Sequence, residues 1–318
     1  MNEKRYVLAA DVGGTNLRIA AVGSDGKLLH QTSTSTPRDG TADEIVEAIV
    51  GAASSCLSRA LVSGKPSSFG LALAALVDPR TGSVYSSPNL PQLDGLPLAN
   101  LISTLLDTEV VLENDATAAA IGESWLGASA GIENSICLTI GTGIGGGLIL
   151  NGRTYRGVGG TAGELGHICV EADGVPCGCG SRGCLEQYSS ATAVVRIARE
   201  LAGKKTSQWN LADRFTAKDV YHAAVAGDPV AIETFQIVGR YLGIALADIV
   251  NVLNPEMIVL GGGGAGSWDF FIEATWSEIR ERAFSHPAEA VEIVRASLGG
   301  NAGILGAASV AFDRARAR

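Results

Sequence analysis

One histidine and three cysteines are spaced like the ligands of a metal site. His167, Cys177, Cys179 and Cys184 follow the pattern H-x9-C-x-C-x4-C. Three thiolates with one imidazole form the donor set of a structural zinc site, which is tetrahedral and leaves no open position for chemistry. Cys169 competes with His167 as the fourth donor, and a reduced cysteine-rich loop or a redox pair is the alternative to a metal. We predict structural Zn²⁺ held by His167 and the three cysteines.

A carboxylate that could accept a proton stands at the end of Glu113-Asn114-Asp115. The stretch Ala116–Leu126 that follows is rich in alanine and is expected to form a helix. Asp115 could therefore act as a general base or simply cap this helix, and the residue pattern leaves both roles open.

Three glycine-rich turns follow short apolar runs. They are Asp11-Val12-Gly13-Gly14-Thr15, Gly141–Gly147 and Gly261–Gly266. Successive N–H groups in such turns form a concave anion site, because no Cβ blocks the approach of a phosphate. Asp11 could hold Mg²⁺ through water beside those phosphates, or it could cap a turn. The alternatives for the glycines are tight packing turns or a dinucleotide-binding fold. The second is disfavoured because residues 148–150 are expected to be strand where that motif requires a helix.

The elements that position these residues form a repeated pattern. Tyr6–Ala10 and Leu17–Val22 are predicted strands around the first glycine turn, and Ser135–Ile140 and 148–150 are predicted strands around the second. This internal repeat suggests a duplicated two-domain fold. The other predicted strands are Phe69–Val77, Glu109–Leu112 and Met257–Leu260, and the predicted helices are 41–63, Leu98–Leu106, Ala116–Leu126, Pro229–Leu253, Trp268–Phe284 and 303–316.

Composition excludes several classes of protein. Among the 318 residues, 24 are basic and 33 are acidic, giving a net charge of −9 without a basic stripe, so nucleic acid is not expected as a partner. No signal peptide and no uninterrupted apolar run of about 18 residues is evident, so no membrane association is expected. The expected location is the cytoplasm. The 41 glycines exceed the usual share, which fits backbone that must approach a ligand closely.

Taken in order along the chain, the motifs resemble those of the ROK family (repressors, open reading frames and sugar kinases). The segments that carry the resemblance are Asp11–Thr15, Glu113–Asp115, Gly141–Gly147, Ala162–His167, Cys177–Glu186 and Asn254-Pro255. The resemblance covers essentially the whole chain. It implies two actin-like (ribonuclease H-like) α/β domains flanking a cleft in which ATP and a hexose meet. The small domain comprises residues 1–115 joined by the C-terminal helix 303–318, and the large domain comprises residues 116–302 with the zinc loop.

The resemblance also implies roles for individual residues. The family's catalytic base corresponds to Asp115. The expected sugar-binding residues are Asn89, Asn114, Asp115, Glu164, His167 and Glu186. The expected nucleotide-binding residues are Asp11, Gly13, Gly14, Thr15, Gly141, Thr142, Gly143, Gly262 and Gly263. The implied cofactors are ATP, catalytic Mg²⁺ and structural Zn²⁺.

The expected reaction is ATP-dependent phosphorylation of glucose to glucose 6-phosphate, and the expected assembly is a homodimer or homotetramer. Kinases for N-acetylmannosamine, N-acetylglucosamine or fructose are the alternative within the family. Gln92-Leu93 replaces a common Gly-Trp pair and Gly159 replaces a common Asn, which bears on sugar choice. Gly70–Leu76 also lacks the prolines of many relatives. A sugar-responsive repressor is disfavoured, because the ten residues before Asp11 are too few for a DNA-binding helix-turn-helix.

Overall fold

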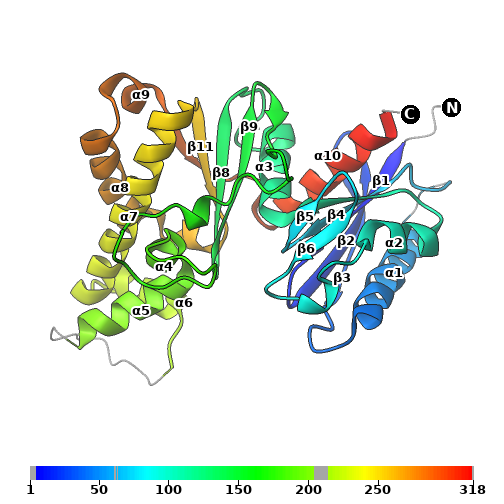
Figure 1. Cartoon of the computed structure of the whole chain (residues 1–318), viewed down its shortest axis with the longest axis horizontal. Coiled ribbons are helices and arrows are strands. Elements are labelled where there is room, and N and C mark those ends of the chain that lie inside the picture. Colours follow the sequence, from blue (N-terminus) through cyan, green and yellow to red (C-terminus); the bar gives the residue numbers. More distant parts are fainter. Residues whose placement is uncertain (1–4, 61, 63, 204–213, 317–318) are drawn as a thin grey trace. The chain divides into compact units, whose positions relative to one another are not determined.

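The computed structural model describes residues 5–60, 62, 64–203 and 214–316. The chain divides into two compact units (Figure 1). Unit 1 comprises Met1–Glu133, Gly147–Gly163 and Ala296–Arg318, and unit 2 comprises Asn134–Gly146 and Glu164–Arg295. The chain therefore passes from one unit to the other several times, and the C-terminal helix belongs to the same unit as the N-terminal strands.

A five-stranded sheet forms the centre of unit 1, in the order β3-β2-β1-β4-β7. Its first three strands are antiparallel neighbours, whereas β4 and β7 run parallel to β1. The strands are β1 (Tyr6–Val12), β2 (Asn16–Gly23), β3 (Leu28–Ser35), β4 (Phe69–Leu73) and β7 (Val110–Asn114), with a separate hairpin of β5 (Leu76–Asp78) and β6 (Ser83–Ser86). The carboxyl ends of β1, β4 and β7 consequently lie at one edge of the sheet.

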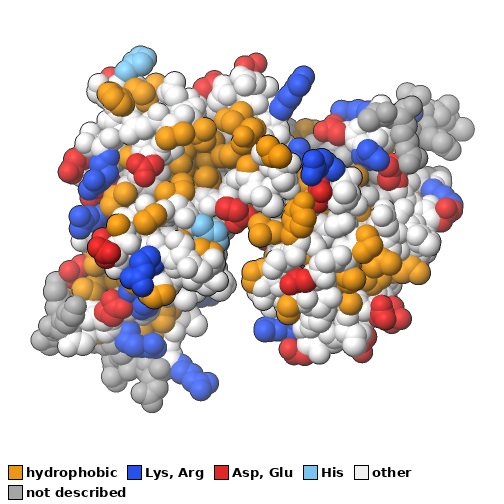
Figure 2. Space-filling model, in the orientation of Figure 1, with side chains coloured by type: hydrophobic (Ala, Val, Ile, Leu, Met, Phe, Trp, Pro, Cys, Tyr) orange, Lys and Arg blue, Asp and Glu red, His pale blue; other side chains and the backbone are white. Residues whose placement is uncertain are grey.

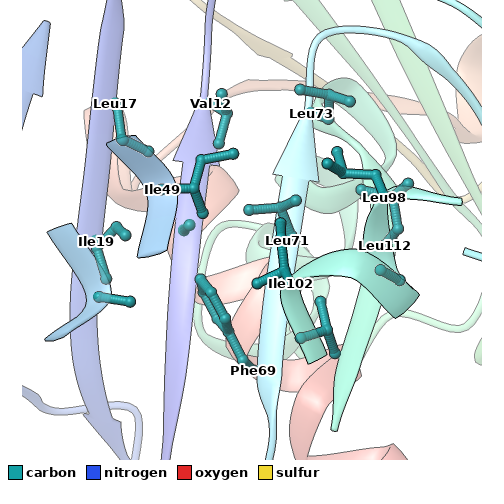
Figure 3. Packing of buried hydrophobic residues seen from close by; sticks show 14 of the residues in the cluster. Val12, Leu17, Ile19, Ile49, Phe69, Leu71, Leu73, Leu98, Ile102 and Leu112 are labelled. Atoms are coloured by element: carbon teal, nitrogen blue, oxygen red, sulfur yellow. The ribbon is translucent and has the colours of Figure 1, made fainter. Parts of the chain in front are cut away.

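Helices cover both faces of this sheet. They are α1 (Ala42–Arg59) and α2 (Leu98–Leu106) on one face and α3 (Asp115–Leu126) and α10 (Ala302–Arg316) on the other, with short 3₁₀ turns η1 (Pro91–Leu93) and η4 (Gly299–Asn301). Alternate residues of β1 point to opposite faces, so Leu8 packs in the cluster with α1 and α2, and Val7 packs in the cluster with α10. Figure 3 shows Ile49 of α1 and Ile102 of α2 among the apolar side chains of the sheet.

The second sheet repeats the order of the first, as β10-β9-β8-β11-β12. Its strands are β8 (Ser135–Ile140), β9 (Ile144–Leu150), β10 (Arg153–Thr154), β11 (Met257–Gly261) and β12 (Glu292–Arg295). The helical elements of unit 2 are η2 (Leu165–His167), α4 (Glu186–Ser189), α5 (Ala191–Ala202), α6 (Ala217–Val225), α7 (Pro229–Leu253), η3 (Gly263–Ser267), α8 (Trp268–Arg282) and α9 (Ser285–Ala290). The predicted duplicated α/β fold is confirmed.

Some boundaries differ from the sequence predictions. The strand predicted over Phe69–Val77 is broken into β4 and β5, and the strand predicted to end at Leu112 continues to Asn114. The glycine turn predicted to reach Gly147 ends at Gly143, because Ile144–Gly147 belongs to β9. A Cβ on Gly147 would lie 2.5 Å from Cβ of Ala120, so a glycine in this strand lets α3 pack closely. The helix predicted over 41–63 ends at Arg59, and residues 61 and 63 lie outside the described residues.

By length and composition alone, helix α7 is long and apolar enough to cross a membrane, whereas the sequence predicted no such stretch. Half of its most apolar 18-residue stretch is buried inside the protein. Helix α7 packs against α8, α5, α4 and α6. The core helix of a water-soluble protein passes the same test, so this observation is weak evidence for a membrane. On the face drawn in Figure 2, Lys and Arg side chains are interspersed with Asp and Glu.

Candidate active site

Asp115 lies at the junction of β7 and α3, in unit 1. Asn114, and not Asp115, is the N-cap of α3, because the Asn114 side chain accepts a hydrogen bond from the N–H of Thr117 at 2.9 Å. The Asn114 amide also donates to the carbonyl of Ala75 at 3.1 Å, which ties the end of β7 to the segment after β4. Asp115 is half-buried in the first turn, where its Oδ1 accepts from the N–H of Ala116 at 2.9 Å. The idea that Asp115 is the helix cap is therefore wrong.

Two residues before Asp115, Glu113 forms a buried ion pair that sequence reasoning missed. The Glu113 side chain is 2% exposed, and its Oε2 lies 2.7 Å from Nε and 2.6 Å from Nη2 of Arg156. Burial raises the pKa of Glu113 above its usual value, and the charge of Arg156 opposes that rise. No spacing signal links residues 113 and 156, so only the folded chain reveals the pair. It fixes the backbone that presents Asn114 and Asp115.

The first glycine turn, also in unit 1, is closed by several backbone contacts. The N–H of Gly13 donates to the carbonyl of Asn16 at 3.0 Å, and Thr36 Oγ1 donates to the carbonyl of Gly13 at 2.8 Å. Asp11 forms an ion pair with Arg18, its register partner on β2. Asn89 packs against Gly14, where a Cβ would lie 2.9 Å from Cβ of Asn89. Unit 1 therefore brings the predicted residue Asn89 onto the predicted phosphate turn.

Two further glycine turns meet in unit 2, at the carboxyl ends of the parallel neighbours β8 and β11. Gly262 adopts φ +79°, and a Cβ there would lie 2.3 Å from the carbonyl oxygen of Ile140. Ile140 directly precedes the turn Gly141-Thr142-Gly143, which is closed by a hydrogen bond from the N–H of Gly141 to the carbonyl of Gly143 at 2.8 Å. The structure thus brings the second and third predicted phosphate turns together.

Two acidic residues and one histidine predicted to bind sugar also lie close together in unit 2. Oε2 of Glu164 is 3.9 Å from Nε2 of His167. Burial raises the pKa of Glu164, nearby Glu186 raises it further, and His167 opposes both effects. Oε2 of Glu186 accepts a hydrogen bond from the N–H of Ile144 at 3.0 Å. Carboxylate and imidazole groups arranged this way can bind the hydroxyls of a polar substrate.

The cysteine–histidine cluster is assembled as the sequence spacing suggests. One ligand atom from each of His167, Cys177, Cys179 and Cys184 lies within 4.8 Å of the others. Nδ1 of His167 is 3.7 Å from Sγ of Cys177, and the Sγ atoms of Cys179 and Cys184 are 3.7 Å apart. Tetrahedral Zn²⁺ with Zn–S bonds of about 2.3 Å places two sulfurs about 3.8 Å apart, so the donor set fits zinc. Cys169 is not in this group.

A cavity of about 990 Å³ in unit 1 lies away from the predicted residues. Its lining includes Arg80, Asn100, Asp107, Arg153, Arg156 and Arg314, but none of the residues predicted to bind sugar, nucleotide or metal. Arg156, the ion-pair partner of Glu113, is among its lining residues. We therefore place the candidate active site at the predicted residues described above and not in this cavity.

Comparison with known proteins relates this arrangement to a family. The ROK family model matches residues 7–314. A glucokinase of Halalkalibacterium halodurans is 37% identical over 310 residues, covering 95% of this chain and 93% of that protein. The crystal structure of a ROK family glucokinase from Streptomyces griseus in complex with glucose and AMPPNP has a TM-score of 0.82 at 34% identity, covering 97% of this chain and 99% of that one.

A ROK family transcriptional regulator, a homolog of the E. coli MLC protein, has a TM-score of 0.89 at 28% identity. It covers 99% of this chain, which in turn covers 79% of the regulator. The same fold thus serves kinases and regulators, so function must be argued from the site residues.

Proposed function

This chain belongs to the ROK family, and on that premise we propose that it transfers the γ-phosphoryl group of ATP to glucose, giving glucose 6-phosphate and ADP. Its glucokinase relatives match nearly the whole chain. The observation that carries the proposal is the junction at Asp115, where a half-buried carboxylate follows a capping asparagine and a buried ion pair. Such support holds a general base in one orientation, as proton transfer requires.

We assign Asp115 the role of general base. As the sugar hydroxyl attacks, its O–H proton passes to the carboxylate, a bond forms between that oxygen and the γ-phosphorus, and the bond from the γ-phosphorus to the bridging oxygen breaks to release ADP. Protein groups contribute mainly positioning and charge stabilisation to phosphoryl transfer, so the base must be placed accurately. The N-cap hydrogen bond of Asn114 supplies that placement.

Sugar hydroxyls are proposed to bind Asn89 and Asn114 in unit 1 and Glu164, His167 and Glu186 in unit 2. The support is chemical, because carboxylates, amides and imidazole pair with both hydrogens and lone pairs of hydroxyls. His167 would serve twice, since Nδ1 faces Cys177 while Nε2 faces Glu164. A kinase for N-acetylmannosamine, N-acetylglucosamine or fructose is the alternative. The replacements at Gln92-Leu93 and Gly159 bear on sugar choice, so these sugars are included in the assay.

Nucleotide phosphates are proposed to bind the glycine turns. Within the described residues, the N–H groups of Thr142 and Gly143 have no protein partner, which suits them to bind an anion. The proposed nucleotide-binding residues are Asp11, Gly13, Gly14, Thr15, Gly141, Thr142, Gly143, Gly262 and Gly263. Asp11 would hold Mg²⁺ through water, and Arg18 fixes the orientation of its carboxylate. When bound, Mg²⁺ neutralises charge that develops on the phosphates.

The zinc site is proposed to be structural, with His167, Cys177, Cys179 and Cys184 as its ligands. Four protein ligands leave no open coordination position, so the ion would supply rigidity to the segment that carries Glu164 and Glu186. The proposal also includes a cytoplasmic location, a role in carbohydrate metabolism through glycolysis, and a homodimer or homotetramer, as the family resemblance implies.

Substitution of the base tests the mechanism. Asp115→Asn removes the proton acceptor while keeping the size of the side chain, so we expect kcat to fall by roughly 10²- to 10⁴-fold. The dissociation constant for glucose, measured by calorimetry, should change little. Turnover within a few-fold of the unsubstituted enzyme would show that Asp115 is not the base.

A further inference from the structure

The turn Gly141-Thr142-Gly143 is held by one short segment of unit 2, Glu186–Thr192. Thr192 Oγ1 donates to the carbonyl of Thr142 at 2.8 Å, and the N–H of Ala191 donates to the carbonyl of Gly141 at 2.8 Å. On the other side of the turn, Oε2 of Glu186 accepts from the N–H of Ile144. Three hydrogen bonds from seven consecutive positions therefore fix the turn along its length.

Glu186 also contacts the turn by packing. A Cβ on Gly143 would lie 2.2 Å from Oε2 and 3.1 Å from Cδ of Glu186, so this carboxylate lies directly against the glycine. Any larger residue at position 143 would displace it. Oε1 of Glu186 accepts no hydrogen bond from the described residues and can receive one from a ligand.

The bonds leave the ligand-binding face of the turn available. They occupy the carbonyls of Gly141 and Thr142 and the N–H of Ile144, whereas the N–H groups of Thr142 and Gly143 have no partner within the described residues. A flexible glycine turn must be ordered before its N–H groups can bind a phosphate together, and that ordering costs backbone conformational entropy. Holding the turn in advance reduces that cost at the moment of binding.

From these contacts we infer that Thr192 and Glu186 are positioning residues for the nucleotide turn, and that Glu186 links the turn to the sugar. Thr192 holds the carbonyl side through its hydroxyl. Glu186 holds the Ile144 end through Oε2 and offers Oε1 to a sugar hydroxyl. This inference rests on the proposed function, and it adds a role for Thr192 and a second role for Glu186. One carboxylate then serves both substrates.

Direct binding of AMPPNP without hexose tests the role of Thr192. Thr192→Val keeps the side-chain shape and removes the hydroxyl, so we expect the dissociation constant for AMPPNP, measured by calorimetry with Mg²⁺, to rise about 2- to 10-fold. The KM for glucose should not change. Thr104→Val is the matched control, because Thr104 is also exposed and its hydroxyl donates to a backbone carbonyl, that of Asn100 at 2.9 Å. It should leave both constants unchanged.

Glu186 is tested by comparing two substitutions. Glu186→Ala removes the acceptor at Ile144, so we expect weaker binding of AMPPNP, on the order of tenfold, together with a higher KM for glucose. Glu186→Gln keeps an acceptor oxygen, so AMPPNP binding should return close to that of the unsubstituted protein while the KM for glucose stays high. Glu164→Ala should raise the KM for glucose alone.

The outcomes separate this inference from the proposed function. If the unsubstituted protein binds AMPPNP and phosphorylates a hexose, but Thr192→Val and Glu186→Ala bind AMPPNP as tightly as it does, the positioning roles are wrong and the kinase function stands. If the unsubstituted protein does not bind AMPPNP at all, the proposed function and this inference both fail.

Discussion

Removing the partner of Glu113 should destabilise unit 1 strongly, and the effect should depend on pH. The change is Arg156→Met, which keeps much of the length of the side chain and removes its charge and its N–H donors. The Glu113 carboxylate is 2% exposed and would lose both contacts to Arg156, at 2.7 and 2.6 Å. Leaving one member of a buried ion pair alone costs about 3–5 kcal/mol.

The two members of the pair are not equivalent. Arg156 is 31% exposed, so water can hydrate its guanidinium when the partner is missing, whereas Glu113 cannot be hydrated without unfolding. Glu113→Gln should therefore destabilise unit 1 less than Arg156→Met does. The double substitution Glu113→Gln, Arg156→Met leaves no buried charge and should recover part of the loss, which a double-mutant cycle measures.

The dependence on pH follows from the sign of the pKa shift. Burial raises the pKa of Glu113, and removing Arg156 removes the charge that opposes this rise. A carboxyl whose pKa is higher in the folded than in the unfolded state costs stability at pH values above the unfolded pKa, and the cost disappears as pH falls and the group is protonated in both states. The loss of unfolding free energy caused by Arg156→Met should accordingly be larger near pH 7 and shrink as pH falls toward about 4.

Urea unfolding monitored by hydrogen exchange of peptides from β7 and α3 is the appropriate assay, because it reports on unit 1 separately from unit 2. Measurements at pH 7 and pH 4.5 give the deficit, which is the loss of unfolding free energy caused by Arg156→Met, at each pH. A deficit below about 1 kcal/mol at pH 7, the value typical of exposed ion pairs, would refute the reasoning. So would a deficit that grows as pH falls.

Two further predictions concern packing and metal. Gly306→Ala should destabilise unit 1 by several kcal/mol, because a Cβ there would lie 1.6 Å from the carbonyl oxygen of Ala118 where α10 crosses α3. Gly51→Ala, in an exposed and uncrowded position of α1, should instead stabilise by about 0.5–1 kcal/mol, and thermal melts of both variants check the contrast. Protein purified without chelator should contain about one zinc ion per chain by mass spectrometry, and Cys177→Ser should lower that content, whereas Cys169→Ser should not. Metal content far below one per chain in the unsubstituted protein would contradict the zinc site.

Much of the fold could be predicted from periodicity and helix signals. The helices Leu98–Leu106 and Pro229–Leu253 and the strand Ser135–Ile140 have the predicted bounds. At the end of α7, Asn254 adopts a left-handed conformation and Pro255 follows, which is a strong local stop signal. The repeated strand-turn-strand pattern indicated the two matching sheets. These features are local, so the sequence contains them.

What could not be predicted depends on contacts distant in sequence. Gly145 and its neighbours have low strand propensity, yet they lie in β9. Gly147 of that strand packs closely against Ala120 of α3, a contact that no local pattern reveals. The Glu113–Arg156 pair joins residues 43 positions apart. By contrast, the Asp11–Arg18 pair could have been found, since the hairpin of β1 and β2 places those residues opposite each other.

In the candidate site, the residue types could be predicted from the sequence, but the contact that each residue makes could not. The sequence left open whether Asp115 caps α3, and only the backbone geometry assigns the cap to Asn114. Likewise, the sequence suggested Glu186 as a sugar ligand, but its hydrogen bond to Ile144 depends on how α4 packs beside the turn.

The most direct test of the central claim is a steady-state assay of the unsubstituted protein with ATP, Mg²⁺ and a panel of sugars containing glucose, fructose, N-acetylglucosamine and N-acetylmannosamine. We predict that glucose has the highest kcat/KM and that glucose 6-phosphate and ADP form in equal amounts. A preference for another sugar of the panel would contradict the assignment of glucose and leave the kinase class intact. Absence of phosphorylation of every sugar, by protein shown to be folded and to contain zinc, would contradict the central claim itself.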